Sequence, residues 1–143
     1  MCSARVERDE PRFLQRLVAA LSNFGTYWLP VLAWMALIFW FSFQSSLPRS
    51  ADPLLEVITK KGAHAGEYAI LALLFLRALS QGGAFSSRLA VIAWLLAVLY
   101  AASDEFHQSF TPSRTPSPFD VLIDASGGAF ALALVRHLMR PRR

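Results

Sequence analysis

Residues 24–43 form an uncharged and strongly apolar stretch, FGTYWLPVLAWMALIFWFSF. About 20 such residues in a helix span the ~30 Å hydrocarbon core of a bilayer. Pro30 lies in the first turns of this stretch, where proline disturbs a helix least. The stretch is too long for the apolar region of a cleavable signal, and acidic residues at Glu7, Asp9 and Glu10 precede it. The sequence therefore predicts a transmembrane helix here.

Three shorter apolar segments follow, at residues 63–79, 89–103 and 121–138. The 143-residue chain is 55% hydrophobic and only 17% charged, whereas soluble domains carry roughly 25% charged residues. A soluble fold of this composition would expose large apolar patches, which a lipid-facing surface accommodates. We therefore predict a single-domain, all-α membrane protein with four transmembrane helices. The single cysteine, Cys2, excludes an intramolecular disulfide and a cysteine-based metal site.

The segment before the first span, PRFLQRLVAALSNF, spaces its apolar side chains along one face of a helix. Its arginines occupy other positions on the helical wheel, which is typical of a short amphipathic helix on a membrane surface. The predicted organisation has three parts. Residues 1–23 form a cytoplasmic tail with the amphipathic helix, residues 24–138 form the four-helix membrane domain, and residues 139–143 form a basic cytoplasmic tail.

Lysine and arginine concentrate on the cytoplasmic side of membrane proteins. The arginines that flank the predicted spans are Arg5, Arg8, Arg12 and Arg16 before the first, and Arg136, Arg140, Arg142 and Arg143 at the end of the last. We therefore predict both termini in the cytoplasm and the loops at residues 45–60 and 106–118 outside. Since topology explains most of the +4 net charge, we expect no nucleic-acid partner.

Polar residues of the second span share one helical face near its predicted outer end. They are Lys61, His64, Glu67 and Tyr68. Positions three and four apart lie on the same side of a helix. Arg77 falls on another face toward the inner end, and we interpret it as a charge that extends to the cytoplasmic interface.

The third and fourth spans each carry a stripe of small residues beside carboxylates. The stripes are Ala97, Ala101, Asp104 and Gln108, and Asp120, Asp124, Gly127 and Ala131. Small residues let transmembrane helices approach closely, so the acids are predicted to point toward one another. Glu67 and Asp124 lie about a turn inside their spans, where a lone charge is costly. Both a structural ion-pair network and a ligand or catalytic site explain them. Asp120 as an N-cap and Glu105 as a solvated end residue are the simpler interpretations of those two acids.

In order along the chain, the motifs are K-x-x-H-x-x-E-Y from Lys61, S-D-E-x-H-Q from Ser103, R-x-x-S from Arg114 and D-x-x-x-D-x-x-G from Asp120. Together they resemble the VanZ family of small bacterial membrane proteins, over residues 34–135. The family usually has a glycine-rich turn around the arginine, where this chain has TPSRTPSP. The resemblance implies a multi-pass location in the bacterial cytoplasmic (inner) membrane. It also implies a role at the cell envelope, because founding members contribute to resistance to teicoplanin, a glycopeptide that carries a fatty-acyl chain. It implies no reaction.

The candidate ligand-binding residues are Lys61, His64, Glu67, Tyr68, Asp104, His107, Gln108, Arg114, Asp120 and Asp124. We predict that they form an outward-facing polar site for a membrane lipid or a lipid-linked envelope molecule. We expect no cofactor and no metal at this site. The sequence does not say whether a protein partner exists in the membrane.

The alternative is a membrane enzyme that acts on a phosphate-bearing lipid headgroup. His107, Asp104 and Glu105 would then be the candidate acid–base groups, while Lys61 and Arg114 would hold the phosphate. A metal site is a third alternative, because the second and third spans each place an imidazole and a carboxylate three residues apart.

Overall fold

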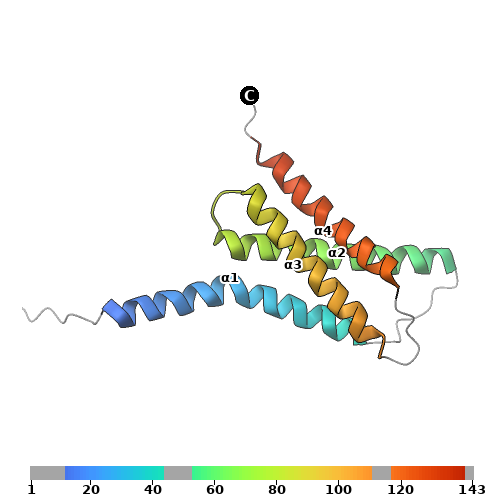
Figure 1. Cartoon of the computed structure of the whole chain (residues 1–143), viewed down its shortest axis with the longest axis horizontal. Coiled ribbons are helices and arrows are strands. Elements are labelled where there is room, and N and C mark those ends of the chain that lie inside the picture. Colours follow the sequence, from blue (N-terminus) through green and yellow to red (C-terminus); the bar gives the residue numbers. More distant parts are fainter. Residues whose placement is uncertain (1–11, 44–52, 111–116, 141–143) are drawn as a thin grey trace, which may run out of the picture.

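The computed structural model describes residues 12–43, 53–110 and 117–140. Within them lie the helices α1 (Arg12–Phe43), α2 (Pro53–Ser80), α3 (Ser87–Gln108) and α4 (Pro118–Leu138). Each helix is long and apolar enough to cross a membrane, which confirms the predicted all-α fold with four transmembrane helices. Figure 1 shows α1 and α3 running in one direction and α2 and α4 in the other. The orientation of this bundle across the membrane stays a prediction.

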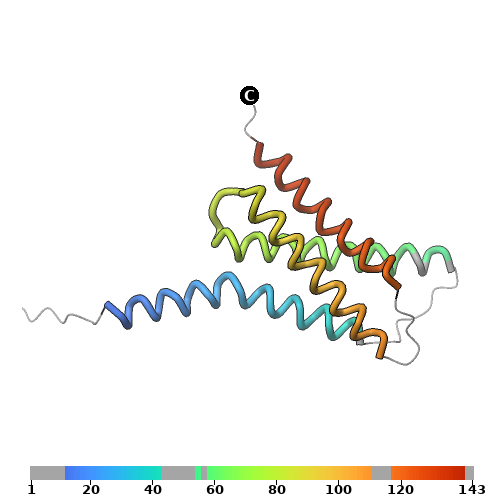
Figure 2. Tube along the Cα trace, viewed as in Figure 1, coloured from blue at the N-terminus to red at the C-terminus, as the bar shows by residue number. Residues whose placement is uncertain are grey.

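The amphipathic segment before the first span is helical from Arg12, and it continues into that span without a break. No proline separates the two parts, and the Thr26 hydroxyl donates a hydrogen bond to the Ser22 carbonyl across the join. The predicted boundary at residue 23 therefore falls inside one long helix. Figure 2 shows the N-terminal part of α1 extending beyond the other helices. Its apolar side chains are exposed, with Phe13 and Leu21 among them.

The second helix is the centre of the fold, since α2 packs against α1, α3 and α4. Its inward face is almost completely buried at Tyr68, Leu71 and Ala72. The facing side of α3 consists of small buried residues, namely Ala90, Ala93, Ala97 and Ala101. Close packing of small residues holds membrane helices together where the hydrophobic effect between them is weak.

Three aromatic side chains tie the helices to one another through the backbone. Trp34 Nε1 donates to the Glu67 carbonyl over 2.9 Å, and Trp94 Nε1 donates to the Ala125 carbonyl over 2.9 Å. The Tyr100 hydroxyl donates to the Met35 carbonyl over 2.6 Å. Such donors must find partners inside the protein, because the lipid core offers none.

The helices α2 and α4 approach each other closely. A Cβ added at Gly127 would overlap the Ala65 carbonyl oxygen and would lie 2.9 Å from the Ala65 Cα. At the next position, a Cβ on Gly128 would lie 3.3 Å from the Ala72 Cβ. The stripe of small residues on α4 therefore permits contact with the backbone of α2, as the sequence predicts.

Candidate functional site

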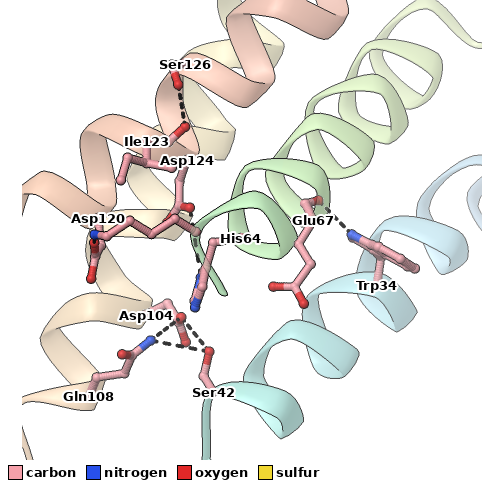
Figure 3. A network of polar contacts seen from close by, with 11 residues as sticks. Trp34, Ser42, His64, Glu67, Asp104, Gln108, Asp120, Ile123, Asp124 and Ser126 are labelled. Carbon is pink, nitrogen blue, oxygen red and sulfur yellow. Dashed lines mark hydrogen bonds and ion pairs between the residues drawn. The ribbon is translucent and has the colours of Figure 1, made fainter. Parts of the chain in front are cut away.

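The site lies where α1 and α3 end and where α4 begins, against residues 61–68 of α2. Its centre is Asp104, which joins α3 to α1 (Figure 3). Ser42 Oγ donates to Asp104 Oδ2 over 2.7 Å, and Gln108 Nε2 donates to the same oxygen over 2.9 Å. All three side chains are buried. The second carboxylate oxygen, Asp104 Oδ1, is also buried and has no hydrogen-bond partner among the described residues.

Asp124 of α4 faces His64 of α2. His64 Nδ1 lies 3.9 Å from Asp124 Oδ1, which is close enough for an electrostatic contact but too far for a hydrogen bond. Asp124 is only 5% exposed, and its Oδ1 accepts no hydrogen bond from the part of the chain that the structure describes. In Figure 3 the side chains of His64, Asp104 and Asp124 point toward one another from three helices.

The rim of the site is the ion pair between Lys61 and Asp120. Lys61 Nζ lies 2.6 Å from Asp120 Oδ1, and the two side chains are 44% and 35% exposed. Ser117 is the N-cap residue of α4, whereas Asp120 lies in the first turn. The interpretation of Asp120 as an N-cap is therefore wrong, and its carboxylate instead joins α4 to α2.

Glu105 is not a solvated end residue, since its carboxylate accepts a hydrogen bond from the backbone N–H of Ser117. This bond connects the last turn of α3 to the start of α4. The side chain is partly buried. Glu105 therefore holds together the two helix ends that carry Asp104 and Asp124.

Several carboxylates lie close enough to repel one another. Glu67 experiences the charge of Asp104, and Asp124 experiences the charges of Asp120 and Asp104. Tyr68 lies among them, and its buried hydroxyl has no hydrogen-bond partner within the described ranges. The interior of the site is thus rich in hydrogen-bond acceptors.

His107 is half-buried, and its ring packs against Phe39 with the centroids 4.7 Å apart. No hydrogen bond or ion pair between His107 and Asp104 occurs in the described structure. In this arrangement the pair proposed for acid–base chemistry is not in direct contact. Among the described residues, no three His, Cys, Asp or Glu side chains form a group that could hold a metal ion.

The structure gathers the predicted ligand-binding residues of α2, α3 and α4 at one end of the bundle, while Arg114 lies outside the described residues. Arg77 stands apart, with its guanidinium 5.4 Å from the ring centre of Tyr27. Sequence reasoning missed Ser42, the partner that α1 contributes. The available signal was a hydroxyl among large apolar residues at the end of the first span.

The comparison with known families gave one match. A family model described as VanZ/LLP1 matches residues 27–140. The chain belongs to the VanZ/LLP1 family. The match contains every residue of the site described above, from Ser42 to Asp124. With its four membrane-length helices, the chain is a multi-pass membrane protein of the VanZ type. No curated protein and no solved structure matches it.

Proposed function

We propose that this site binds the headgroup of an envelope lipid or of a lipid-linked molecule. The observation that carries the proposal is a pair of nearly buried carboxylates, Asp104 and Asp124, each with one oxygen that accepts no hydrogen bond from the described residues. An unsatisfied buried group costs about 1–3 kcal/mol, and more when it is charged. A ligand that donates hydrogen bonds to these oxygens removes that cost.

The unpaired groups favour a particular ligand chemistry. Asp104 Oδ1 and Asp124 Oδ1 are acceptors, and the Tyr68 hydroxyl both donates and accepts. The nearby cation, Lys61, already pairs with Asp120. A headgroup that carries hydroxyl or ammonium groups therefore complements the interior better than a bare phosphate does.

The surroundings suit a ligand that stays partly in lipid. Phe106, Phe110 and Phe119 are each about 70% exposed and lie on the helix ends next to the site. Exposed apolar rings such as these favour contact with lipid, so a headgroup could meet the site while its acyl chain remained in the bilayer. The link of the VanZ family with teicoplanin resistance fits such a ligand, because teicoplanin joins a glycopeptide to a fatty-acyl chain. The outer leaflet of the cytoplasmic membrane is the proposed setting.

The test is to extract the full chain with its native lipids and to identify the bound lipids by mass spectrometry. We expect one lipid class to be enriched over the membrane average in the wild type. Asp124→Asn keeps the size of the side chain but replaces one carboxylate oxygen with an amide nitrogen that cannot accept a hydrogen bond, and it should reduce this enrichment on the order of tenfold, as expected for the loss of one hydrogen bond in a buried site.

The matched control is Arg88→Gln, which removes an exposed charge at the start of α3, away from the site. It should retain the wild-type lipids. Melting curves of all three proteins establish that each is folded. Bulk lipid composition in the wild type, or equal enrichment in all three, would contradict the proposal.

A further inference from the structure

A groove lies between the start of α3 and the end of α4. Figure 1 shows these two helix termini at the opposite end of α3 and α4 from the end of α3 and the start of α4, where Asp104 and Asp120 lie. The groove is open and has a volume of about 480 Å³. Sites for small molecules typically have volumes of about 300–1,000 Å³. Apolar side chains form most of its wall, with Phe85, Val91 and Trp94 on the α3 side and Leu132 on the α4 side.

The groove follows from the packing of α3 against α4. Trp94 Nε1 donates to the Ala125 carbonyl over 2.9 Å, so the indole bridges the two helices and closes one end of the groove. Beyond it three of the lining residues are small, namely Ala90, Ala129 and Ala133. These methyl groups leave the space between the helices unfilled, and an apolar chain can lie along it.

The other end of the groove is basic. Arg136, His137 and Arg140 line it at the end of α4, and no carboxylate lies among the described lining residues. Neither arginine forms an ion pair within the part of the chain that the structure describes. Arg136 lies in the last turn of α4 and Arg140 lies two residues after its end, so the groove brings two positive side chains to one place, where they repel each other. An anion placed between them would remove this repulsion.

We propose that the groove binds an anionic phospholipid. Its phosphate would accept hydrogen bonds from Arg136 and Arg140, since guanidinium groups bind phosphate in a bidentate manner. The adjoining methylene groups would lie against Trp94 and Val91. Basic pockets between membrane helices are known to hold anionic lipid headgroups. This groove does not overlap the carboxylate site. The groove is basic and suits an anionic group, whereas the carboxylate site is acidic and suits a group that donates hydrogen bonds.

The test is a titration of the purified full-length protein in detergent, with bound lipid counted by native mass spectrometry. The probes are dioleoyl-phosphatidylglycerol and dioleoyl-phosphatidylcholine. The wild type should prefer phosphatidylglycerol. The double variant Arg136→Gln/Arg140→Gln should bind it on the order of tenfold more weakly, because charged hydrogen bonds are lost. Both arginines are exposed, so this variant should fold.

The matched control is Arg12→Gln/Arg16→Gln, which removes two exposed arginines with the same spacing from α1. It should bind phosphatidylglycerol as the wild type does. An equal loss in this control would show that overall charge governs binding and would overturn the proposal. Unchanged binding by the groove variant, or equal affinity of the wild type for the two lipids, would overturn it as well.

A second variant tests the apolar part of the groove without altering charge. Ala133→Trp places an indole in the groove, whereas Ala102→Trp places one on an exposed part of α3 that does not line it. Only the first should weaken phosphatidylglycerol binding. Equal binding by both variants would show that the lipid does not enter the groove.

Discussion

The two ends of the helix bundle differ in their charged side chains. Every acidic side chain that the structure describes belongs to the site end: Glu67, Asp104, Glu105, Asp120 and Asp124. At the other end, the described charged side chains of α2, α3, α4 and the two residues after α4 are Arg77, Arg88, Arg136 and Arg140, and all are exposed.

The difference follows from the lengths of the side chains. A short carboxylate inside a membrane span needs partners from neighbouring helices, and Asp104 obtains one from Ser42 of α1. A long arginine extends to the interface without help from the fold. Acids at the site end therefore contribute to helix packing. Arginines at the other end contribute little to packing and are available to bind a ligand.

The largest effect is expected where the acidic end depends on helix contact. Gly127→Ala places a methyl group on the Ala65 carbonyl of α2. Overpacking costs typically 1–3 kcal/mol, and more is expected here because backbone, rather than a flexible side chain, must move. We expect a clear loss of thermal stability in detergent, with α4 displaced from α2.

The control is Gly66→Ala on α2, where nothing lies within 4 Å of the added Cβ. Alanine in a helix interior is favoured over glycine by roughly 0.5–1 kcal/mol, so this variant should melt at or above the wild-type temperature. Equal melting temperatures for the two variants would mean that α2 and α4 are not in close contact at Gly127.

A smaller effect is expected for a pair of variants that compares the two ends directly. Asp104→Ala removes the acceptor that Ser42 and Gln108 share inside the protein, which should cost about 1–3 kcal/mol. Arg136→Gln changes an exposed side chain, and its effect should stay within about 0.5 kcal/mol. The free energy of unfolding of each variant in detergent is the measurement.

Asp104→Ala also relieves the repulsion of Asp104 with Glu67 and Asp124. If the variant were more stable than the wild type, this repulsion would outweigh the lost hydrogen bonds. The acidic end would then not be held together by its own contacts, and the contrast drawn between the two ends would be wrong.

Helical periodicity is sufficient to predict much of this structure from the sequence. Four apolar stretches predict four spans, and the spacing of Ala97, Ala101 and Asp104 predicts the buried face of α3. These features depend on one helix at a time. Residues three or four apart share a face wherever the helix is placed.

Features that depend on which helices are neighbours were not predictable in this way. Ser42 reaches Asp104 because α1 packs against α3. The His107 ring meets Phe39 of α1 rather than Asp104, which lies on its own helix. The basic groove arises from how α3 and α4 separate around Trp94, and no spacing within one segment encodes that separation.

The smallest effect is expected at the rim of the acidic end, where Lys61 pairs with Asp120. The 2.6 Å contact is short, but the side chains are 44% and 35% exposed, and solvated ion pairs contribute only about 0–1 kcal/mol. A double-mutant cycle with Lys61→Gln and Asp120→Asn isolates this coupling from the other effects of each change. We expect a coupling within that range that decreases as salt is added, because exposed charges are screened. A coupling well above it, insensitive to salt, would mean that water does not reach the pair. The rim would then be closed like the interior around Asp104, and a headgroup would have no open route past Lys61 to the buried carboxylates.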